Sequence, residues 1–314
     1  MAQATAVSTT EWAGDQDDEM TTAARTQRDH RRAAEPAPPT VMVGVDGSQN
    51  CAAAVNWAAD RAVRGHRRLT LLAVLDERWP RDGHHQVADP ENPLGSPYLQ
   101  RIREQLVEDH PDLSVDLQAR VGSVLSTLLD VSDDQLMLVV GRRGLGALGR
   151  IALGSVSVGV AGRAGVPVVV VPSSWDPELH REDPVVVGRH PTRPNAATLE
   201  FAYAEAAVRG AELIIVDVPS SPRHRSTEGS GAGGDQLLLK RLSRSRPEVR
   251  LRTVEQSGRP DEVLSRQSAA AQLLVLGRHR SRLSGLDFGS TVRAALHRAQ
   301  LPVAVVPAFA DRSA

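Results

Sequence analysis

The sequence is poor in cysteine, in aromatic residues and in net charge, and each scarcity narrows what the chain can be. Cys51 is the only cysteine among 314 residues, so no disulfide can form within one chain, which is typical of a reducing cytosol. Aromatic residues make up 3%, which leaves Val, Leu, Ala and Ile to build the core. The net charge of −1 provides no overall field to attract nucleic acid or an anionic membrane.

Long apolar runs are scarce as well. Val166–Val171 is interrupted by Pro167 and is far shorter than the roughly 18 residues of a membrane span. Residues 1–38 show no apolar stretch resembling the centre of a signal peptide. They carry an acidic patch and then a basic one without periodicity, which predicts a disordered tail. We therefore expect a soluble, cytoplasmic protein whose folded part begins at residue 39.

From Val41 onward, short apolar runs alternate with helical patterns. The runs Val41–Val45, Leu69–Leu75, Leu136–Val140 and Val166–Pro172 predict buried strands, and Ala52–Arg64 has the apolar spacing of a helix. The patterns also predict a helix at 99–108, a strand at 113–120 and a helix at 123–131. Alternating strands and helices are typical of a parallel sheet covered on both faces, which predicts an α/β fold.

The same pattern then starts again. Val185–Gly188 corresponds to Val41–Gly44, and Leu301–Pro307 corresponds to Val166–Pro172. A chain of this length suits two domains, so we interpret it as a duplicated, doubly wound α/β domain. The expected limits are 1–38 for the tail, 39–173 and 184–309 for the two domains, 174–183 for the linker and 310–314 for a second tail. Residues 76–97 and 219–234 are expected to be loops.

A frame of glycines follows the predicted strand Leu136–Val140. Gly141 and Gly144 are followed, after nine further residues, by Gly154 and Ser155 at the start of a predicted helix. Spaced glycines between a strand and a helix start allow backbone N–H groups to surround phosphate oxygens. Glycine permits close backbone approach and positive φ, and Ser155 can donate its hydroxyl and cap the helix. Nearby arginines, including Arg142, supply charge.

Two shorter phosphate motifs overlap this frame. Gly144–Gly149 has the literal G-x-G-x-x-G spacing of a dinucleotide fold, but it follows a late strand, and no acidic residue occurs from Leu145 to Trp175. Gly149–Ser155 has the glycine spacing of a P-loop, with Ser155 where a lysine must reach the phosphates. A tight strand-to-helix connection that binds nothing is the remaining alternative.

Three separated segments together resemble the universal stress protein family. They are the first strand ending in Val-Asp-Gly-Ser at 45–48, the G-x2-G-x9-G-[S/T] spacing, and the Val-Val-Val-Pro at 169–172. The resemblance covers nearly all of residues 39–309, and the duplication is similar to the tandem form of that family. It implies two Rossmann-like domains of the adenine nucleotide alpha hydrolase type and an ATP site in the first copy. It assigns that site to Asp46, Val74, Gly141, Arg143, Gly144, Gly154, Ser155 and Val156.

The resemblance also implies roles for these residues. Asp46 stands at the adenosine end of the ligand, Val74 lines the adenine pocket, and the residues from Gly141 onward surround ribose and phosphates, with Mg²⁺ carried by the phosphates. It implies a nucleotide-dependent sensor or regulator rather than an enzyme. A slow ATPase or nucleotidyl transferase, or a scaffold that has lost its ligand, is the alternative. Terminal strands Val168–Val171 and Val303–Val306 are expected to pair within the chain, while a further homodimer and a signalling partner stay open.

The second copy departs from the pattern. His190 stands where Asp46 does, Arg280 replaces the second glycine, and eight residues rather than nine separate it from Gly289. These changes predict weak or absent nucleotide binding in the second copy. Elsewhere, the pair at 84–85, both histidine, lacks partners spaced for a metal, and Cys51, among small neighbours, is expected to be packed in the core.

Overall fold

A computed structural model describes residues 39–48, 51–76, 95–142, 153–190, 195–219, 230–279 and 288–308. The predicted tails at 1–38 and 310–314 lie outside these residues, as does most of the predicted loop at 76–97. Residues 39–172 are called the N-terminal half below, and residues 183–308 the C-terminal half.

The N-terminal half alternates strands and helices as its apolar pattern predicts. The elements are β1 (Val41–Val45), α2 (Ala52–Arg64), β2 (Leu69–Leu75), α3 (Pro97–Asp109), β3 (Val115–Val121), α4 (Val124–Ser132), β4 (Met137–Gly141), α5 (Ser155–Arg163) and β5 (Val168–Val171). The central strands are apolar along their whole length because helices cover both of their faces.

The C-terminal half repeats this order after a short 3-10 turn, η3 (Glu178–His180). Its elements are β6 (Val185–Arg189), α6 (Ala196–Arg209), β7 (Leu213–Asp217), α7 (Ser230–Ser245), β8 (Leu251–Glu255), α8 (Pro260–Gln267), β9 (Leu273–Arg278), α9 (Ser290–Arg298) and β10 (Val303–Pro307).

The predicted loop at 219–234 is wrong in its last part, because α7 already begins at Ser230. Its first turn is rich in glycine, which disfavours a helix by about 1 kcal/mol per residue relative to alanine. Tertiary contacts outweigh that preference. Leu238 is buried in the core, and the buried carboxylate of Asp235 accepts a hydrogen bond from the Asn195 amide at 3.0 Å.

All ten strands join in one sheet with the order β3-β2-β1-β4-β5-β10-β9-β6-β7-β8. Neighbouring strands within each half are parallel, whereas β5 and β10 pair antiparallel, with Val169 opposite Ala304. The predicted doubly wound α/β fold is therefore confirmed. So is the expected pairing of the two terminal strands within the chain.

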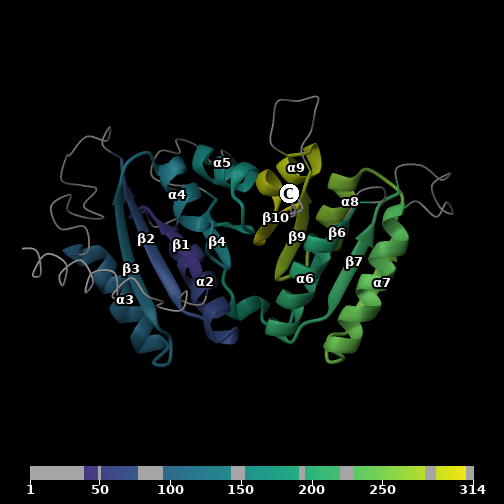
Figure 1. Ribbon diagram of the computed structural model, residues 1–314, viewed down its shortest axis with the longest axis horizontal. Helices are drawn as coiled ribbons and strands as arrows, with labels where there is room; N and C mark the ends of the chain where they lie inside the picture. The colour runs from purple at the N-terminus through teal and green to yellow at the C-terminus, as the bar shows by residue number, and fades with distance from the viewer. Residues whose placement is uncertain are drawn as a thin grey trace, which may run out of the picture. The chain divides into compact units, whose positions relative to one another are not determined.

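The helices cover the two faces of the sheet in a regular way. Figure 1 shows α2, α3, α6 and α7 on one face and α4, α5, α8 and α9 on the other. The chain reverses its direction across the sheet after β3 and again after β8, and right-handed crossovers then place the following helices on the opposite face. The reversal creates a switch point between β1 and β4, and an equivalent one between β6 and β9.

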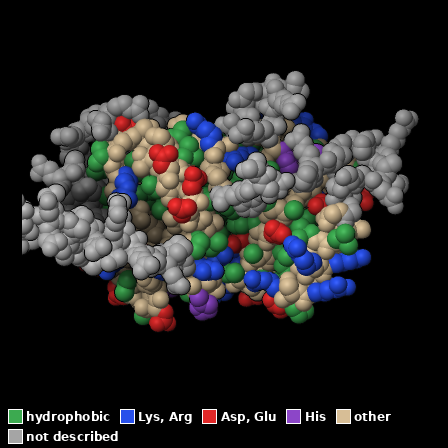
Figure 2. Space-filling model, in the orientation of Figure 1, with side chains coloured by type: hydrophobic (Ala, Val, Ile, Leu, Met, Phe, Trp, Pro, Cys, Tyr) green, Lys and Arg blue, Asp and Glu red, His purple; other side chains and the backbone are tan. Residues whose placement is uncertain are grey.

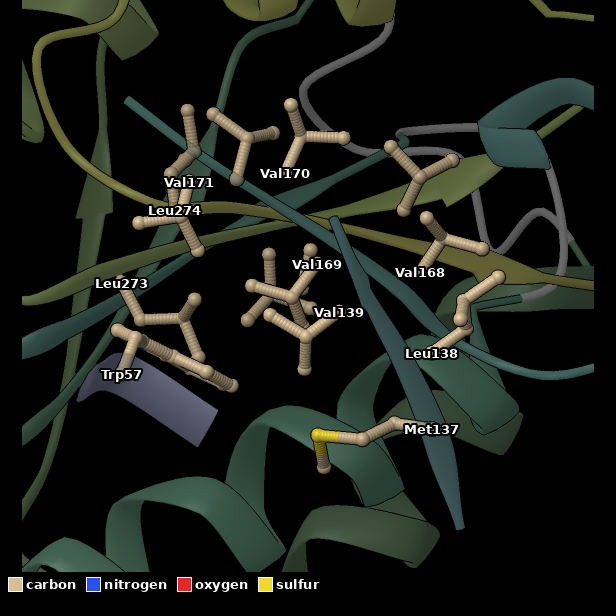
Figure 3. Packing of buried hydrophobic residues seen from close by; sticks show 14 of the residues in the cluster. Trp57, Met137, Leu138, Val139, Val168, Val169, Val170, Val171, Leu273 and Leu274 are labelled. Atoms are coloured by element: carbon tan, nitrogen blue, oxygen red, sulfur yellow. The ribbon is translucent and has the colours of Figure 1, made fainter. Parts of the chain in front are cut away.

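A single hydrophobic core runs through both halves. Trp57 of α2 is fully buried and belongs to the same cluster as Val169 of β5 and Leu273 of β9, as Figure 3 shows. Cys51 is 4% exposed, so its predicted place in the core is confirmed. Because the core is continuous across β5 and β10, the two halves bury apolar surface against each other.

The near-zero net charge conceals an uneven distribution. Figure 2 shows acidic side chains gathered over α4 and basic ones over α7. The exposed residues there are Asp130, Asp133 and Asp134 in one group and Lys240, Arg241 and Arg244 in the other. Among the described residues, no helix has the length and apolar character that a membrane span requires.

Candidate functional site

The predicted site residues of the N-terminal half gather at the carboxyl ends of three neighbouring strands. Asp46 directly follows β1, Gly141 ends β4, and Val74 is the penultimate residue of β2. The register pairs Val43 with Val139, so the ends of β1 and β4 lie at the same level. Open α/β sheets bind ligands at such a switch point, outside the carboxyl ends of the strands.

A tight turn holds the carboxylate of Asp46. Its Oδ1 accepts hydrogen bonds from the backbone N–H of Ser48 at 3.0 Å and from the Ser48 hydroxyl at 2.7 Å. Gly47 between them has φ +80°, a conformation that a side chain with a β-carbon rarely adopts. The Asp-Gly-Ser sequence therefore fixes the direction of the Asp46 side chain, which is half-buried.

Cys51 packs against this turn. Its thiol donates to the Ser48 carbonyl at 3.0 Å and lies 3.3 Å from the Tyr98 hydroxyl. Desolvation by burial raises the pKa of the Cys51 thiol, and the nearby Asp46 carboxylate raises it further. Burial and the contact with Cys51 likewise raise the pKa of Tyr98. Both groups are therefore neutral around the turn at neutral pH.

The start of α5 closes the other side of the switch point. Gly154 is the N-cap, with extended φ −66° and ψ 140°, and its N–H donates to the Arg142 carbonyl at 3.0 Å. Ser155 is the first helical residue and is exposed, and Val156 is half-buried. The expectation that Ser155 caps the helix is thus wrong, because Gly154 is the cap residue. What glycine contributes here is a cap position without a side chain.

Ser157 is a contributor that the sequence reasoning missed. Its hydroxyl donates to the Gly141 carbonyl at 2.7 Å and is buried, so it ties α5 to the end of β4. The sequence does carry a signal for this contact, since Ser157 is a polar residue on the inner side of a helix that is rich in valine and glycine.

Arg142, whose charge the sequence assigns to the frame, also contacts the C-terminal half. Its Nη1 donates to the Ala299 carbonyl at 2.6 Å, which belongs to the C-terminal half. Arg278, at the corresponding place after β9, donates its Nη1 to the Ala161 carbonyl at 3.4 Å. Each arginine thus contacts the opposite half. The predicted site residues Arg143 and Gly144 lie outside the described residues.

This arrangement suits an anion near α5. The first backbone N–H groups of a helix lack intrahelical acceptors and carry partial positive charge. Gly154 places no side chain over them, and the exposed Ser155 offers a hydroxyl beside them. The acidic side chain of Asp46 lies across the switch point, where it can accept hydrogen bonds from neutral hydroxyl groups. The residues present therefore fit a ligand with an anionic end and a hydroxyl-bearing end.

Two histidine side chains meet at the equivalent switch point in the C-terminal half. His190 follows β6, His279 follows β9, and their rings meet edge to face with centroids 5.4 Å apart. Asn195 holds His190 in place, because its Oδ1 accepts from the His190 N–H and its Nδ2 donates to the His190 carbonyl, both at 2.9 Å. A β-carbon at Gly277 would lie 2.7 Å from the Thr198 hydroxyl oxygen, which shows how close the packing is.

An ion pair borders the same place. Arg189 and Asp217, the last residues of β6 and β7, form a two-pronged contact in which Arg189 Nε donates to Asp217 Oδ1 at 2.6 Å. These hydrogen bonds raise the pKa of the Arg189 guanidinium. The charges of Arg189 and Asp217 at this edge of the C-terminal half therefore neutralise each other.

Comparison with known proteins agrees with this geometry. A family model described as "Universal stress protein family" matches the chain twice, over residues 39–172 and 183–307. The chain belongs to the universal stress protein family. Its two matched segments make it a tandem member.

Relatives share this tandem length. A universal stress protein of Mycolicibacterium smegmatis is 30% identical over 285 residues, which cover 85% of this chain and 96% of the relative. One of Mycobacterium tuberculosis strain H37Rv is 32% identical over 286 residues, which cover 84% and 96%. The fold also resembles the crystal structure of a universal stress protein from Archaeoglobus fulgidus, with a TM-score of 0.59, 20% identity and coverage of 85% and 98%.

Proposed function

We propose that the N-terminal half binds ATP and that the protein acts as a nucleotide-dependent sensor or regulator in the stress response, with one nucleotide site per chain. The observation that carries this proposal is the contrast between the two switch points. In the N-terminal half, Asp46 and the glycine-capped start of α5 face the carboxyl edge. In the C-terminal half, where Gly289 likewise caps α9, His190 stands in the place of Asp46 and its ring contacts that of His279.

In this proposal the phosphates lie at the start of α5, near Gly154, Ser155 and Val156, and the adenosine end lies toward Asp46 and Val74. Gly141, Arg143 and Gly144 complete the frame. The described residues contain no group of three potential protein ligands for a metal, so Mg²⁺ reaches the site on the phosphates. We further propose a cytoplasmic location, which the single cysteine favours.

We also propose that the protein binds ATP without catalysing its turnover. Hydrolysis requires a group that orients or deprotonates the attacking water. Asp46, which is half-buried in the switch point, already accepts two hydrogen bonds from Ser48 on one oxygen. Its place in the site is at the adenosine end, away from the helix start that attracts phosphate.

Calorimetric titration of the full chain with ATP tests the binding proposal. We expect one ATP per chain, an affinity that falls at least about tenfold in Asp46→Ala, which is about 1.4 kcal/mol, and no change in the matched variant His190→Ala. Gly144→Arg, which introduces the residue found at 280, should also abolish binding. Two ATP molecules per chain, or equal losses in both matched variants, would contradict a single N-terminal site.

Two further measurements separate the alternatives. Turnover of labelled ATP that disappears in Asp46→Ala would favour an ATPase. The absence of adenine nucleotide from the purified protein, together with no thermal shift on adding ATP, would favour a scaffold that has lost its ligand.

A further inference from the structure

A cluster of charged side chains is buried where α2 of the N-terminal half meets α6 of the C-terminal half. Arg61 is 4% exposed and Glu205 1% exposed, and Arg61 Nε donates to Glu205 Oε1 at 2.7 Å. Arg209 lies beside them, with its Nε 3.4 Å from Glu205 Oε2 and its Nη1 3.6 Å from Asp60 Oδ2. Its guanidinium also lies over the ring of Trp57, 4.8 Å from the centroid.

Burying these charges between two helices costs desolvation free energy. Within the described residues, Arg61 Nη1, Arg209 Nη2 and Glu205 Oε2 have no hydrogen-bond partner. Buried ion pairs with incomplete hydrogen bonding are often less stabilising than apolar side chains of similar volume. Asp60 and Gln272 also contact Arg209, but they leave these three atoms without a hydrogen bond, so stability alone does not explain why charges occupy this place.

The two halves are related by an approximate two-fold axis that passes through this interface. The antiparallel pairing of β5 and β10 is centred on Val169 opposite Ala304. Arg142 donates to the Ala299 carbonyl at the end of α9, and Arg278 donates to the Ala161 carbonyl within α5. An arginine of each half therefore contacts a helix segment of the other half.

Arg61 and Glu205 occupy equivalent positions in that symmetry. Arg61 lies 20 residues after Val41, the start of β1, and Glu205 lies 20 residues after Val185, the start of β6 (61 − 41 = 205 − 185). An interface between two N-terminal halves would thus oppose Arg61 to Arg61, and one between two C-terminal halves would oppose Glu205 to Glu205. In the first case each buried Arg61 would lose its carboxylate partner and face a like charge where the local dielectric constant is low. In the second case each Glu205 would keep only Arg209 of its own helix.

The edge strands β5 and β10 do little to distinguish a correct partner half from a second copy of the same half. The β5 edge consists of four valines, and the β10 edge is Val-Ala-Val-Val-Pro. Either edge can pair with a copy of itself as readily as with the other, and exposed apolar edges promote such pairing. Selectivity must therefore come from elsewhere in the interface.

We propose that the Arg61–Glu205 pair selects the partner of each half, so that an N-terminal half accepts a C-terminal half and rejects a second copy of itself. The surface formed by α2 and β5 is thus an interaction surface specific for a half that presents a buried carboxylate at the position equivalent to Arg61. A charged group retained for specificity at a cost in stability has precedents in other interfaces.

A disulfide reporter in the full chain tests this selection. In a Cys51→Ala background, Val169→Cys forms an intermolecular disulfide only when two N-terminal halves pair through β5, because Val169 faces Ala304 in the native pairing. The protein is refolded from urea in a thiol redox buffer at low and at high protein concentration, and covalent dimer is quantified. Val169→Cys with Ala304→Cys in one chain is the positive control for native pairing.

We expect almost no covalent dimer while the charge pair is intact. With Arg61→Met and Glu205→Met added, the dimer fraction at high concentration should rise at least about tenfold, since a factor of ten needs only about 1.4 kcal/mol of lost discrimination. Equal dimer fractions in both backgrounds would overturn the proposal. If circular dichroism shows that the methionine pair does not fold, Arg61→Gln with Glu205→Gln, which removes the charges but keeps hydrogen bonding, decides by the same readout.

Discussion

Gly44 and Gly188 occupy the same position in the two halves, each being the fourth residue of its first strand, but their surroundings differ. A β-carbon at Gly188 would lie 2.8 Å from Leu276 Cδ2 and 3.0 Å from Leu264 Cδ2. A β-carbon at Gly44 would meet its nearest atom, Leu128 Cδ2, at 3.5 Å, which is ordinary contact. Alanine therefore fits at one position and crowds its neighbours at the other.

The magnitudes follow from two opposing effects. Replacing glycine by alanine stabilises by about 0.4–1 kcal/mol where the backbone tolerates it, because the unfolded chain loses freedom. Overpacking a core costs about 1–3 kcal/mol. Leu264 and Leu276 are buried, so moving their methyl groups aside disturbs other side chains of the core. We expect Gly188→Ala to lower the free energy of unfolding by about 1–2 kcal/mol and Gly44→Ala to raise it by about 0.5–1 kcal/mol.

Urea unfolding followed by circular dichroism measures both variants under the same conditions. Comparable slopes with midpoints shifted in opposite directions would agree with the expected free energies. The reasoning is refuted if both variants shift the midpoint in the same direction by similar amounts, because the equivalent glycines would then have equivalent surroundings.

Three further predictions concern polar groups at the two switch points. Burial raises the pKa of Cys51 above its ordinary value of 9.0, so above that pH the folded state binds more protons than the unfolded state. The free energy of unfolding should therefore fall as the pH rises above that value, and it should fall less in Cys51→Ala. Iodoacetamide should modify the thiol of the native protein far more slowly than that of the unfolded protein. Ser157→Ala removes a buried hydrogen bond to the end of β4 and should cost about 1–3 kcal/mol of unfolding free energy, whereas the exposed Ser155→Ala should stay within about 0.5 kcal/mol in the same urea titration. Asn195→Asp sets a second carboxylate where the amide nitrogen lay 3.0 Å from Asp235, so the urea midpoint should fall at about pH 7 and recover toward about pH 5, where one carboxyl is protonated; a midpoint independent of pH would contradict this contact.

Much of the fold was readable because buried parallel strands appear as unbroken apolar runs. The predicted limits of Val41–Val45, Ala52–Arg64 and Leu69–Leu75 are those of β1, α2 and β2. Clear turn residues bound these elements, and helices on both faces impose the same apolar requirement on every strand residue. The repeat of this pattern indicated the tandem architecture, which the match to the family in two segments confirms.

Local patterns failed where distant contacts decide the conformation. The first turn of α7 is glycine-rich but helical, and just beyond it Asp235 accepts a hydrogen bond from Asn195, 40 residues away. No local pattern predicted that the Arg142 guanidinium contacts the Ala299 carbonyl, 157 residues away. Propensity and charge are properties of a short segment, whereas these contacts depend on where the sheet brings other segments.

By itself, the sequence determined two doubly wound domains, a glycine-framed strand end in the first, and a second copy whose frame is altered. Its short-range signals suffice for these features because period, turn residues and spacing act within one element or between neighbours. Only the tertiary structure decided that two histidine rings meet at the second switch point and that Arg61 is buried against Glu205. Both features depend on which side chains face each other in the ten-stranded sheet in which β5 pairs with β10. A buried charge needs an oppositely charged partner, and only the folded chain determines which charges are buried.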